Sequence, residues 1–162
     1  MELQLVNPDP KYSKVRLIDP SPLGYLHVAA EVRPPARPGP VLASRERTLL
    51  LGGLKVLGRQ LESVPGVQKV SVYDAMAFGL PSGYVRQRTA LIRPARFDVV
   101  VLAETDSAEV AGDVRGSAEY RALVDHMTAA SRRVHAIAAR NIKRVGDVDK
   151  SRPGTFLFNY FV

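Results

Sequence analysis

The sequence of 162 residues contains no cysteine and no tryptophan. Without thiols the chain cannot form disulfides, thiolate zinc sites, iron–sulfur clusters or a cysteine nucleophile. It also has no uncharged apolar run that approaches the ~18 residues of a membrane span, and no basic leader before an apolar segment. We therefore expect a cytoplasmic protein that does not associate with membranes and whose site chemistry depends on histidine, tyrosine and glutamate.

The residues that are present have the composition of a soluble globular domain, with 46% hydrophobic and 24% charged residues. A chain of this length can bury a core of its own without disulfides or metal ions. The net charge of +7 is compatible with nucleic-acid binding, but the basic residues are spread over several segments. Residues 97–101, FDVVV, also lack the interleaved aromatic and basic residues of RNA-binding sheets. Nucleic-acid binding is therefore the weakest of the functions considered.

Prolines divide the chain into an arm and a domain. Clustered prolines predict an extended N-terminal arm over residues 1–23. The domain then occupies residues 24–162 and contains a long connection at 77–95 that glycine and proline punctuate. A connection of that length in a compact domain is usually functional or interfacial.

Apolar spacing predicts two helices and four strands in the domain. One helix is capped by Ser44, and its leucines recur on one face from Leu50 to Leu61. A long second helix, with cap residues at Asp106 and Ser117, is expected to continue to Gly146. Alternating or continuous apolar residues predict strands over 24–32, 67–73, 97–105 and 155–162.

The order of these elements is β-α-β-β-α-β, which predicts an α+β, ferredoxin-like fold: a four-stranded antiparallel sheet with both helices on one face. The opposite, helix-free face is partly apolar, and the last strand at 155–162 is an uncharged aromatic edge. A second copy packed against this face would cover it and enclose a cavity, which predicts a homodimer. The alternative is that the arm and the 77–95 connection fold back over the face within one chain.

Two segments carry a resemblance to a known superfamily. Residues 97–107, FDVVVLAETDS, are followed at 116–123 by GSAEYRAL. This strand, its turn and the start of the next helix resemble the dimeric α/β-barrel superfamily, nearest its EthD-like and antibiotic-biosynthesis-monooxygenase-like groups. The resemblance implies a ferredoxin-like dimer. Because the superfamily includes cofactor-free oxygenases, haem-handling proteins and isomerases, it also implies that the function is to be sought among these classes. The chain departs from the pattern at Ala118, where these groups commonly have proline.

The first strand carries the best candidate site. His27 lies beside Tyr25 and Glu31 on its helix-free face, and Tyr73 of the second strand faces the same way. A histidine flanked by a carboxylate and phenols can act as a general base on an activated phenol or enol, the step that a cofactor-independent oxygenase needs before oxygen attack. Asn159 could orient a ligand carbonyl. The alternative is that these groups only form hydrogen bonds at an interface.

The other histidines and a group of arginines give weaker signals. His126 and His135 are nine residues apart, about 2.5 turns of the expected helix, so they cannot share a metal ion and no metal site is expected. Either could ligate haem alone, which keeps haem as an alternative to the absence of a cofactor. A basic patch near the long connection could attract a carboxylate or phosphate, or form a solvated surface; it consists of Arg86, Arg88, Arg93 and Arg96.

Together these observations predict a dimeric α/β barrel that binds a small apolar or aromatic molecule. The first hypothesis is a cofactor-independent oxygenase for an aromatic or polyketide-like substrate, with His27 as the base. The second is a non-catalytic ligand-binding or stress-associated protein, in which the polar cavity residues affect only affinity or stability. The sequence alone does not choose between an enzyme and a binding protein.

Overall fold

A computed structural model describes residues 17–32, 39–40, 44–78 and 96–144 of the chain. The elements follow one another as β1 (Gly24–Val32), β2 (Gly39–Pro40), α1 (Arg45–Glu62), β3 (Val67–Asp74), β4 (Ala77–Phe78), β5 (Val99–Thr105), α3 (Ala108–Arg115), α4 (Ala118–Ala130) and β6 (Ser131–Arg140).

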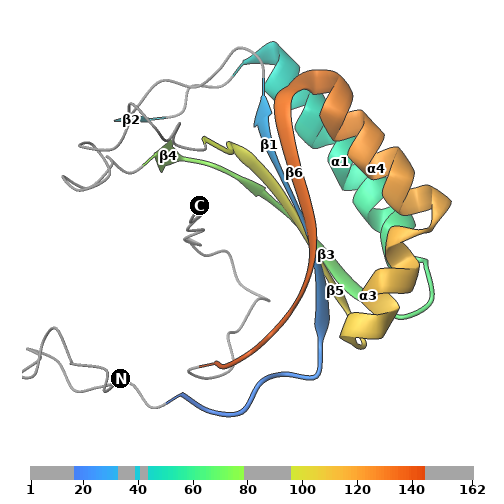
Figure 1. The fold of residues 1–162 in the computed structure, drawn as a ribbon. Helices are drawn as coiled ribbons and strands as arrows, with labels where there is room; N and C mark the ends of the chain where they lie inside the picture. The colour runs from blue at the N-terminus through green and yellow to red at the C-terminus, as the bar shows by residue number, and fades with distance from the viewer. Residues whose placement is uncertain (1–16, 33–38, 41–43, 79–95, 145–162) are drawn as a thin grey trace, which may run out of the picture.

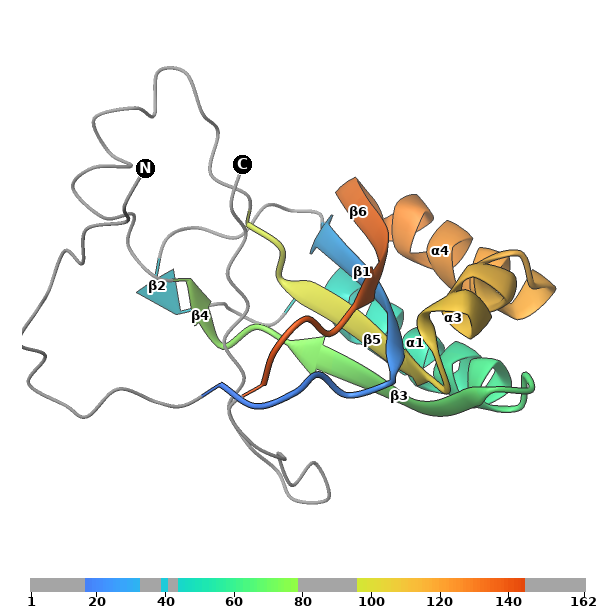
Figure 2. The same cartoon turned by 60° about the horizontal axis from the view of Figure 1, so that its bottom comes forward.

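The main sheet has four antiparallel strands in the order β3-β5-β1-β6. Figure 1 shows that the sheet is curved, with α1, α3 and α4, the helices that the structure describes, all on its convex side. A separate two-stranded pair, β2 with β4, lies away from this sheet (Figure 2). The predicted ferredoxin-like α+β fold is therefore confirmed, with one more helix than expected between β5 and the last strand.

The core lies between the convex face of the sheet and the helices. The leucine stripe of α1 packs there as predicted, with Leu54 fully buried and Leu50 and Leu61 nearly so. The strands contribute the alternate residues that the sequence assigned to the inside, such as Leu26 and Val28 of β1. β5 is buried along both faces, which explains its unbroken apolar run.

Each of the three helices in the described part of the chain begins at a serine cap. Ser44 accepts a hydrogen bond from the backbone N–H of Arg47, and Ser117 caps α4 in the same way, so both predicted caps are confirmed. The N-cap of α3 is Ser107, one residue after the predicted cap, and its C-cap is Gly116. The expected single long helix is thus two helices, because Gly116 and Ser117 stop one and start the next.

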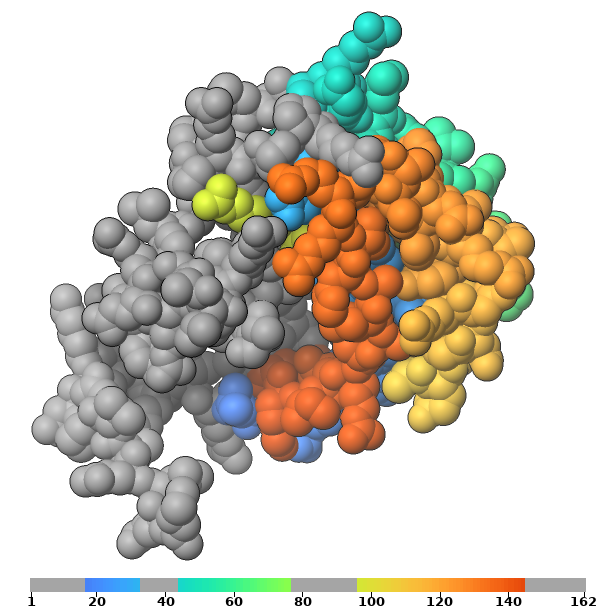
Figure 3. Space-filling view, turned by 45° about the horizontal axis from the view of Figure 1, so that its top comes forward, coloured from blue at the N-terminus to red at the C-terminus, as the bar shows by residue number. Residues whose placement is uncertain are grey.

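The second helix also ends earlier than predicted. The expectation of a helix to Gly146 is wrong, because α4 ends at Ala130 and residues 131–140 form β6. Val134 and Ala136 of β6 pack against the core, and β6 forms backbone hydrogen bonds with the outer edge of β1. This pairing outweighs the helix propensity of the alanines. β6 holds the place in the sheet that we assigned to residues 155–162, which lie outside the described residues. In the space-filling view of Figure 3, β6 lies at the surface beside α4.

Part of the predicted N-terminal arm lies beside the segment that follows β6. Ile18 and Arg144 exchange backbone hydrogen bonds of 2.7 and 3.3 Å. The backbone N–H of Ser21 donates to Oδ1 of Asn141 at 3.2 Å. Ile18 and Ser21 are therefore hydrogen-bonded to the segment that follows β6. None of the described helices is long and apolar enough to cross a membrane.

The packing of α1 against α4 depends on Gly53. A Cβ atom at this position would lie 2.2 Å from Nε2 of His126, a buried ring atom that has no hydrogen-bond partner in the described structure. A Cβ at the neighbouring Gly52 would have no atom within 4 Å. The two glycines are adjacent in one helix, but only Gly53 provides space that α4 uses.

We expect opposite effects from alanine at these two glycines. Gly52→Ala should raise the free energy of unfolding by about 1 kcal/mol, because alanine favours the helix and contacts nothing. Gly53→Ala should lower it by roughly 1 kcal/mol, because the His126 ring must move out of a packed contact. Urea unfolding of the two variants measures the difference, and equal stabilisation by both would contradict the α1–α4 packing.

Candidate functional site

The concave face of the sheet collects side chains from all four strands in rows fixed by the register. The central row crosses β3, β5, β1 and β6 and consists of Ser71, Leu102, His27 and Ile137. The row on one side of it consists of Lys69, Glu104, Tyr25 and Ala139, and the row on the other side of Tyr73, Val100, Ala29 and His135. Paired residues of antiparallel strands point to the same face, so these rows form one surface.

His27 lies in the middle of this surface. Its cross-strand neighbours, Leu102 and Ile137, are apolar. Burial lowers the pKa of His27 below its ordinary value, nearby His135 lowers it further, and a hydrogen bond with its own backbone opposes the shift. The imidazole is therefore neutral at neutral pH, which is the form that can accept a proton.

Of the predicted site residues Tyr25, Tyr73 and Asn159, only Tyr25 is placed by the structure next to His27. Tyr25 is its neighbour on the same face of β1. Tyr73 faces the same way from β3, but β5 lies between them and Tyr73 packs with Ala29 and Phe97. Asn159 lies outside the described residues.

Glu31 is too far along β1 to contact His27. Four residues separate the two, which is about 13 Å along a strand. The Glu31 carboxylate instead forms an ion pair of 3.6 Å with Nη1 of Arg132. The carboxylate that we expected beside His27 is therefore directed to an arginine of β6.

Phe97, Arg133 and His135 also belong to this face but were not predicted as site residues, and the last two lie in a segment that was predicted to be helical. The ring of Phe97 stacks on that of His135 with centroids 6.0 Å apart and an angle of 21° between the planes. The guanidinium carbon of Arg133 lies 5.9 Å from the centroid of the same Phe97 ring. The signal was present as a period of two, with Val134 and Ala136 alternating with Arg133 and His135.

The premise that His126 and His135 share a helix is also wrong, because they lie on α4 and β6. His126 packs against α1 on the convex side of the sheet, whereas His135 is on the concave side. Within residues 17–32, 39–40, 44–78 and 96–144, no three histidine or carboxylate side chains gather as a metal site would require. Of the predicted arginine patch, only Arg96 belongs to this part of the chain.

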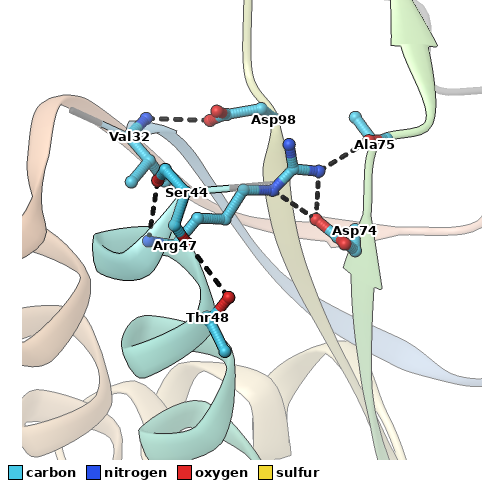
Figure 4. Close-up of polar contacts among 7 residues, drawn as sticks. All are labelled: Val32, Ser44, Arg47, Thr48, Asp74, Ala75 and Asp98. Carbon is cyan, nitrogen blue, oxygen red and sulfur yellow. Dashed lines mark hydrogen bonds and ion pairs between the residues drawn. The ribbon is translucent and has the colours of Figure 1, made fainter. Parts of the chain in front are cut away.

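A buried polar cluster holds the strands at one end of the concave face (Figure 4). Arg47 of α1 is 5% exposed; its Nε donates to Oδ1 of Asp74 at 2.5 Å and its Nη2 to the carbonyl of Ala75 at 2.6 Å. Asp98 is 3% exposed and accepts a 2.8 Å hydrogen bond from the backbone N–H of Val32. These contacts connect α1 and the ends of β1 and β3 to the residues that precede β5.

A pocket of about 310 Å³ lies elsewhere, at the end of the sheet where β1 begins and β6 ends. Its walls come from residues 20–23, 108–109 and 140–142, and they include neither His27 nor Tyr25. We place the candidate site on the concave face because the neutral base and the aromatic side chains are there, whereas this pocket is lined by residues from loops and from the ends of α3 and β6.

No protein-family model and no curated protein matches the chain. Several solved structures resemble it in the arrangement of elements. A dimeric protein of unknown function and ferredoxin-like fold from Bacteroides fragilis is 10% identical, with a TM-score of 0.49 over 75% of this chain and 98% of that one. The fold is ferredoxin-like by its own element order and its strand order β3-β5-β1-β6.

Two further structures have the same degree of likeness. An ethyl tert-butyl ether D (EthD) family protein from Bacillus halodurans is 12% identical, with a TM-score of 0.45 over 72% of this chain and 96% of that one. A hydroxynitrile lyase from Passiflora edulis is 10% identical, with a TM-score of 0.45 over 82% of this chain and 100% of that one. The EthD family is one of the groups that the sequence resembles, and the likeness concerns the fold alone.

Proposed function

We propose that the protein is a homodimeric α/β barrel that binds a small aromatic or otherwise apolar molecule between the concave faces of two sheets. In this proposal His27 removes a proton from an enol, a phenol or an equally acidic C–H group of that molecule. The observation that carries the proposal is the position of His27: a half-buried, neutral imidazole between Leu102 and Ile137 at the centre of the concave face.

Apolar side chains on the concave face support the dimer. Ile137 is 41% exposed on β6, and Leu102 of β5 and Tyr73 of β3 are partly exposed on the same face. Two such faces packed together would bury this surface and form a cavity around the central row.

We expect the dimer in sedimentation velocity at micromolar concentration. Ile137→Lys should shift the protein toward the monomer, because it places a charge in the middle of the proposed interface. Leu49→Lys is the matched control, because Leu49 is 65% exposed on α1, on the other side of the sheet. A wild-type protein that sediments as a monomer would exclude the two-sheet arrangement.

Proton removal prepares such a molecule for oxygen. His27 takes the proton, and the electron pair left on the substrate forms an enolate that a carbonyl stabilises. The enolate carbon then reduces O₂ and forms a C–O bond, and the proton returns to the peroxide oxygen. The carbon is oxidised and O₂ is reduced to the hydroperoxide level, so the step requires only substrate and oxygen.

The test is oxygen uptake with 1,8-dihydroxyanthrone, an aromatic ketone with an acidic C–H group. Wild-type protein should accelerate uptake above the uncatalysed rate, and His27→Gln should lower the catalysed rate by about 100-fold or more. His126→Gln is the matched control, because His126 lies between α1 and α4 and should leave the rate unchanged. Full turnover by His27→Gln would exclude His27 as the base.

The same experiment separates the oxygenase from a binding protein. If the anthrone binds, as followed by its absorbance, but wild type and His27→Gln both leave oxygen uptake at the uncatalysed rate, the protein is a ligand carrier. His27 would then affect affinity alone.

A further inference from the structure

Arg133 projects from β6 onto the concave face without a carboxylate partner among the described residues. It is paired with Glu31 across the strands, but the Glu31 carboxylate forms its ion pair with the adjacent Arg132. The Arg133 guanidinium instead lies over the Phe97 ring. An exposed guanidinium on an aromatic platform keeps its N–H donors available to an acceptor from outside the chain.

Phe97 holds Arg133 and His135 at the same place. The Phe97 ring is only 8% exposed, so it is a fixed surface, with the imidazole of His135 stacked 6.0 Å from its centroid and the guanidinium carbon 5.9 Å from it. The Arg133 guanidinium and the His135 ring, both of which can donate hydrogen bonds, therefore contact the same aromatic ring. This is a suitable arrangement for an anion attached to an apolar body.

The strand register fixes how far Arg133 and His135 lie from His27. Arg133 is paired with Glu31, which is four residues from His27, whereas His135 is paired with Ala29, which is two residues from His27. The Arg133 end of the face is therefore about 13 Å from the base at the level of the backbone, and His135 lies between them. The side chains on the surface between the two ends are largely apolar or aromatic, as in Val100, Leu102 and Phe97.

We infer that the molecule bound on this face is an aromatic carboxylate. Its carboxylate binds Arg133 and His135, its rings lie over the apolar middle of the face, and its acidic hydroxyl or C–H group reaches His27. Because the Arg133 and His27 side chains themselves cover part of the backbone separation of about 13 Å, a skeleton roughly 10 Å long, the size of two or more fused rings, spans the rest. The inference rests on the proposed function, because it takes the concave face as the ligand-binding face.

A pair of probes that differ in one group tests this inference. 6-Hydroxy-2-naphthoate carries a hydroxyl and a carboxylate at opposite ends of two fused rings, and 2-naphthol has the same hydroxyl without the carboxylate. Titration by probe fluorescence should give the naphthoate about tenfold higher affinity than 2-naphthol, the effect of one charge-assisted, bidentate contact. Arg133→Gln should remove this advantage and leave the affinity for 2-naphthol unchanged.

Matched variants separate the position of the charge from its amount. Arg121→Gln removes the same charge from the exposed surface of α4 and should preserve the advantage of the naphthoate. His135→Gln should reduce it in part, because the second donor is lost while Arg133 remains.

The outcomes distinguish this inference from the proposed function. If both probes bind equally and Arg133→Gln changes neither affinity, the carboxylate site is excluded while the ligand-binding face stands. If neither probe binds and the anthrone produces no oxygen uptake, both proposals are excluded. An equal loss of naphthoate affinity in Arg133→Gln and Arg121→Gln would show a general charge effect and would also exclude the site.

Discussion

Gly24→Ala is expected to lower the free energy of unfolding by roughly 3 kcal/mol, a large part of the stability of a small domain. The reason is the contact between β1 and the start of α3. A Cβ atom on Gly24 would lie 2.1 Å from the carbonyl oxygen of Ser107 and 2.7 Å from Cα of Ala108. Both are backbone atoms, so no side-chain rotation can relieve the clash.

The structure around Ser107 leaves α3 little freedom to move. The Ser107 carbonyl accepts hydrogen bonds from the Thr105 hydroxyl at 2.8 Å and from the backbone N–H of Ala111 at 3.0 Å. Ala111 and Val114 of α3 are buried in the core. A displacement of the helix start would therefore disturb a hydrogen-bonded turn and a packed helix together.

Urea unfolding of Gly24→Ala measures this effect, with Gly112→Ala as the matched control. Gly112 lies inside α3, and a Cβ there would have no atom within 4 Å. Gly112→Ala should therefore raise the free energy of unfolding by about 1 kcal/mol. If both substitutions change stability equally, the close approach of β1 to α3 is not present in solution.

Asp98→Ala is expected to lower the free energy of unfolding by about 2–3 kcal/mol, because it leaves the buried backbone N–H of Val32 without an acceptor. Asp98→Asn keeps an oxygen at the same place and should preserve that 2.8 Å hydrogen bond. The two variants therefore separate the hydrogen bond from the charge. Equal destabilisation by both at neutral pH would contradict this assignment.

The charge of Asp98 is expected to oppose stability at neutral pH. Burial raises the pKa of its carboxyl above the ordinary value of 3.8, although the Val32 N–H and Arg47 partly counteract burial. In the window between 3.8 and the raised pKa, the folded state binds the proton more tightly than the unfolded state. The stabilising contribution of the protonated Asp98 carboxyl to the free energy of unfolding is thus fully present below pH 3.8. It is lost as the pH rises through the pKa of Asp98 in the folded state.

Asp98→Asn should remove this pH-dependent loss. Unfolding by urea at several pH values should show the variant gaining on the wild type as the pH rises above 3.8 and keeping a constant advantage beyond the folded pKa. A difference that runs the other way, with the wild type gaining as the pH rises, would show that the ionised carboxylate is favoured in the folded state.

The parts of the fold that could be predicted have one unambiguous apolar period. In α1 the leucines from Leu50 to Leu61 include a stripe at helical spacing, and in β3 Val70 and Val72 alternate with polar residues, so both elements and their inward faces were predictable. Residues 134–139 are rich in alanine and fit both a helix and a strand. That segment becomes β6 because β1 has an edge to pair with and the core has a surface to cover.

The candidate site divides in the same way. Alternation along β1 places Tyr25 and His27 on one face whatever the rest of the chain does, so these two could be assigned from sequence. Glu31 lies on the same face, but the ion pair with Arg132 depends on the position of β6. His135 and Arg133 belong to the site only because β6 is a strand paired with β1, which turns their side chains to the same face as His27.

The sequence by itself thus determined the absence of thiol chemistry, the order of β1, α1, β3 and β5, and the presence of His27 on the helix-free face, because composition and local period are sufficient for these. Only the tertiary structure decided which side chains surround His27. Contacts across the sheet depend on which strand pairs with which and in what register, and a short alanine-rich segment carries no local signal strong enough to specify either.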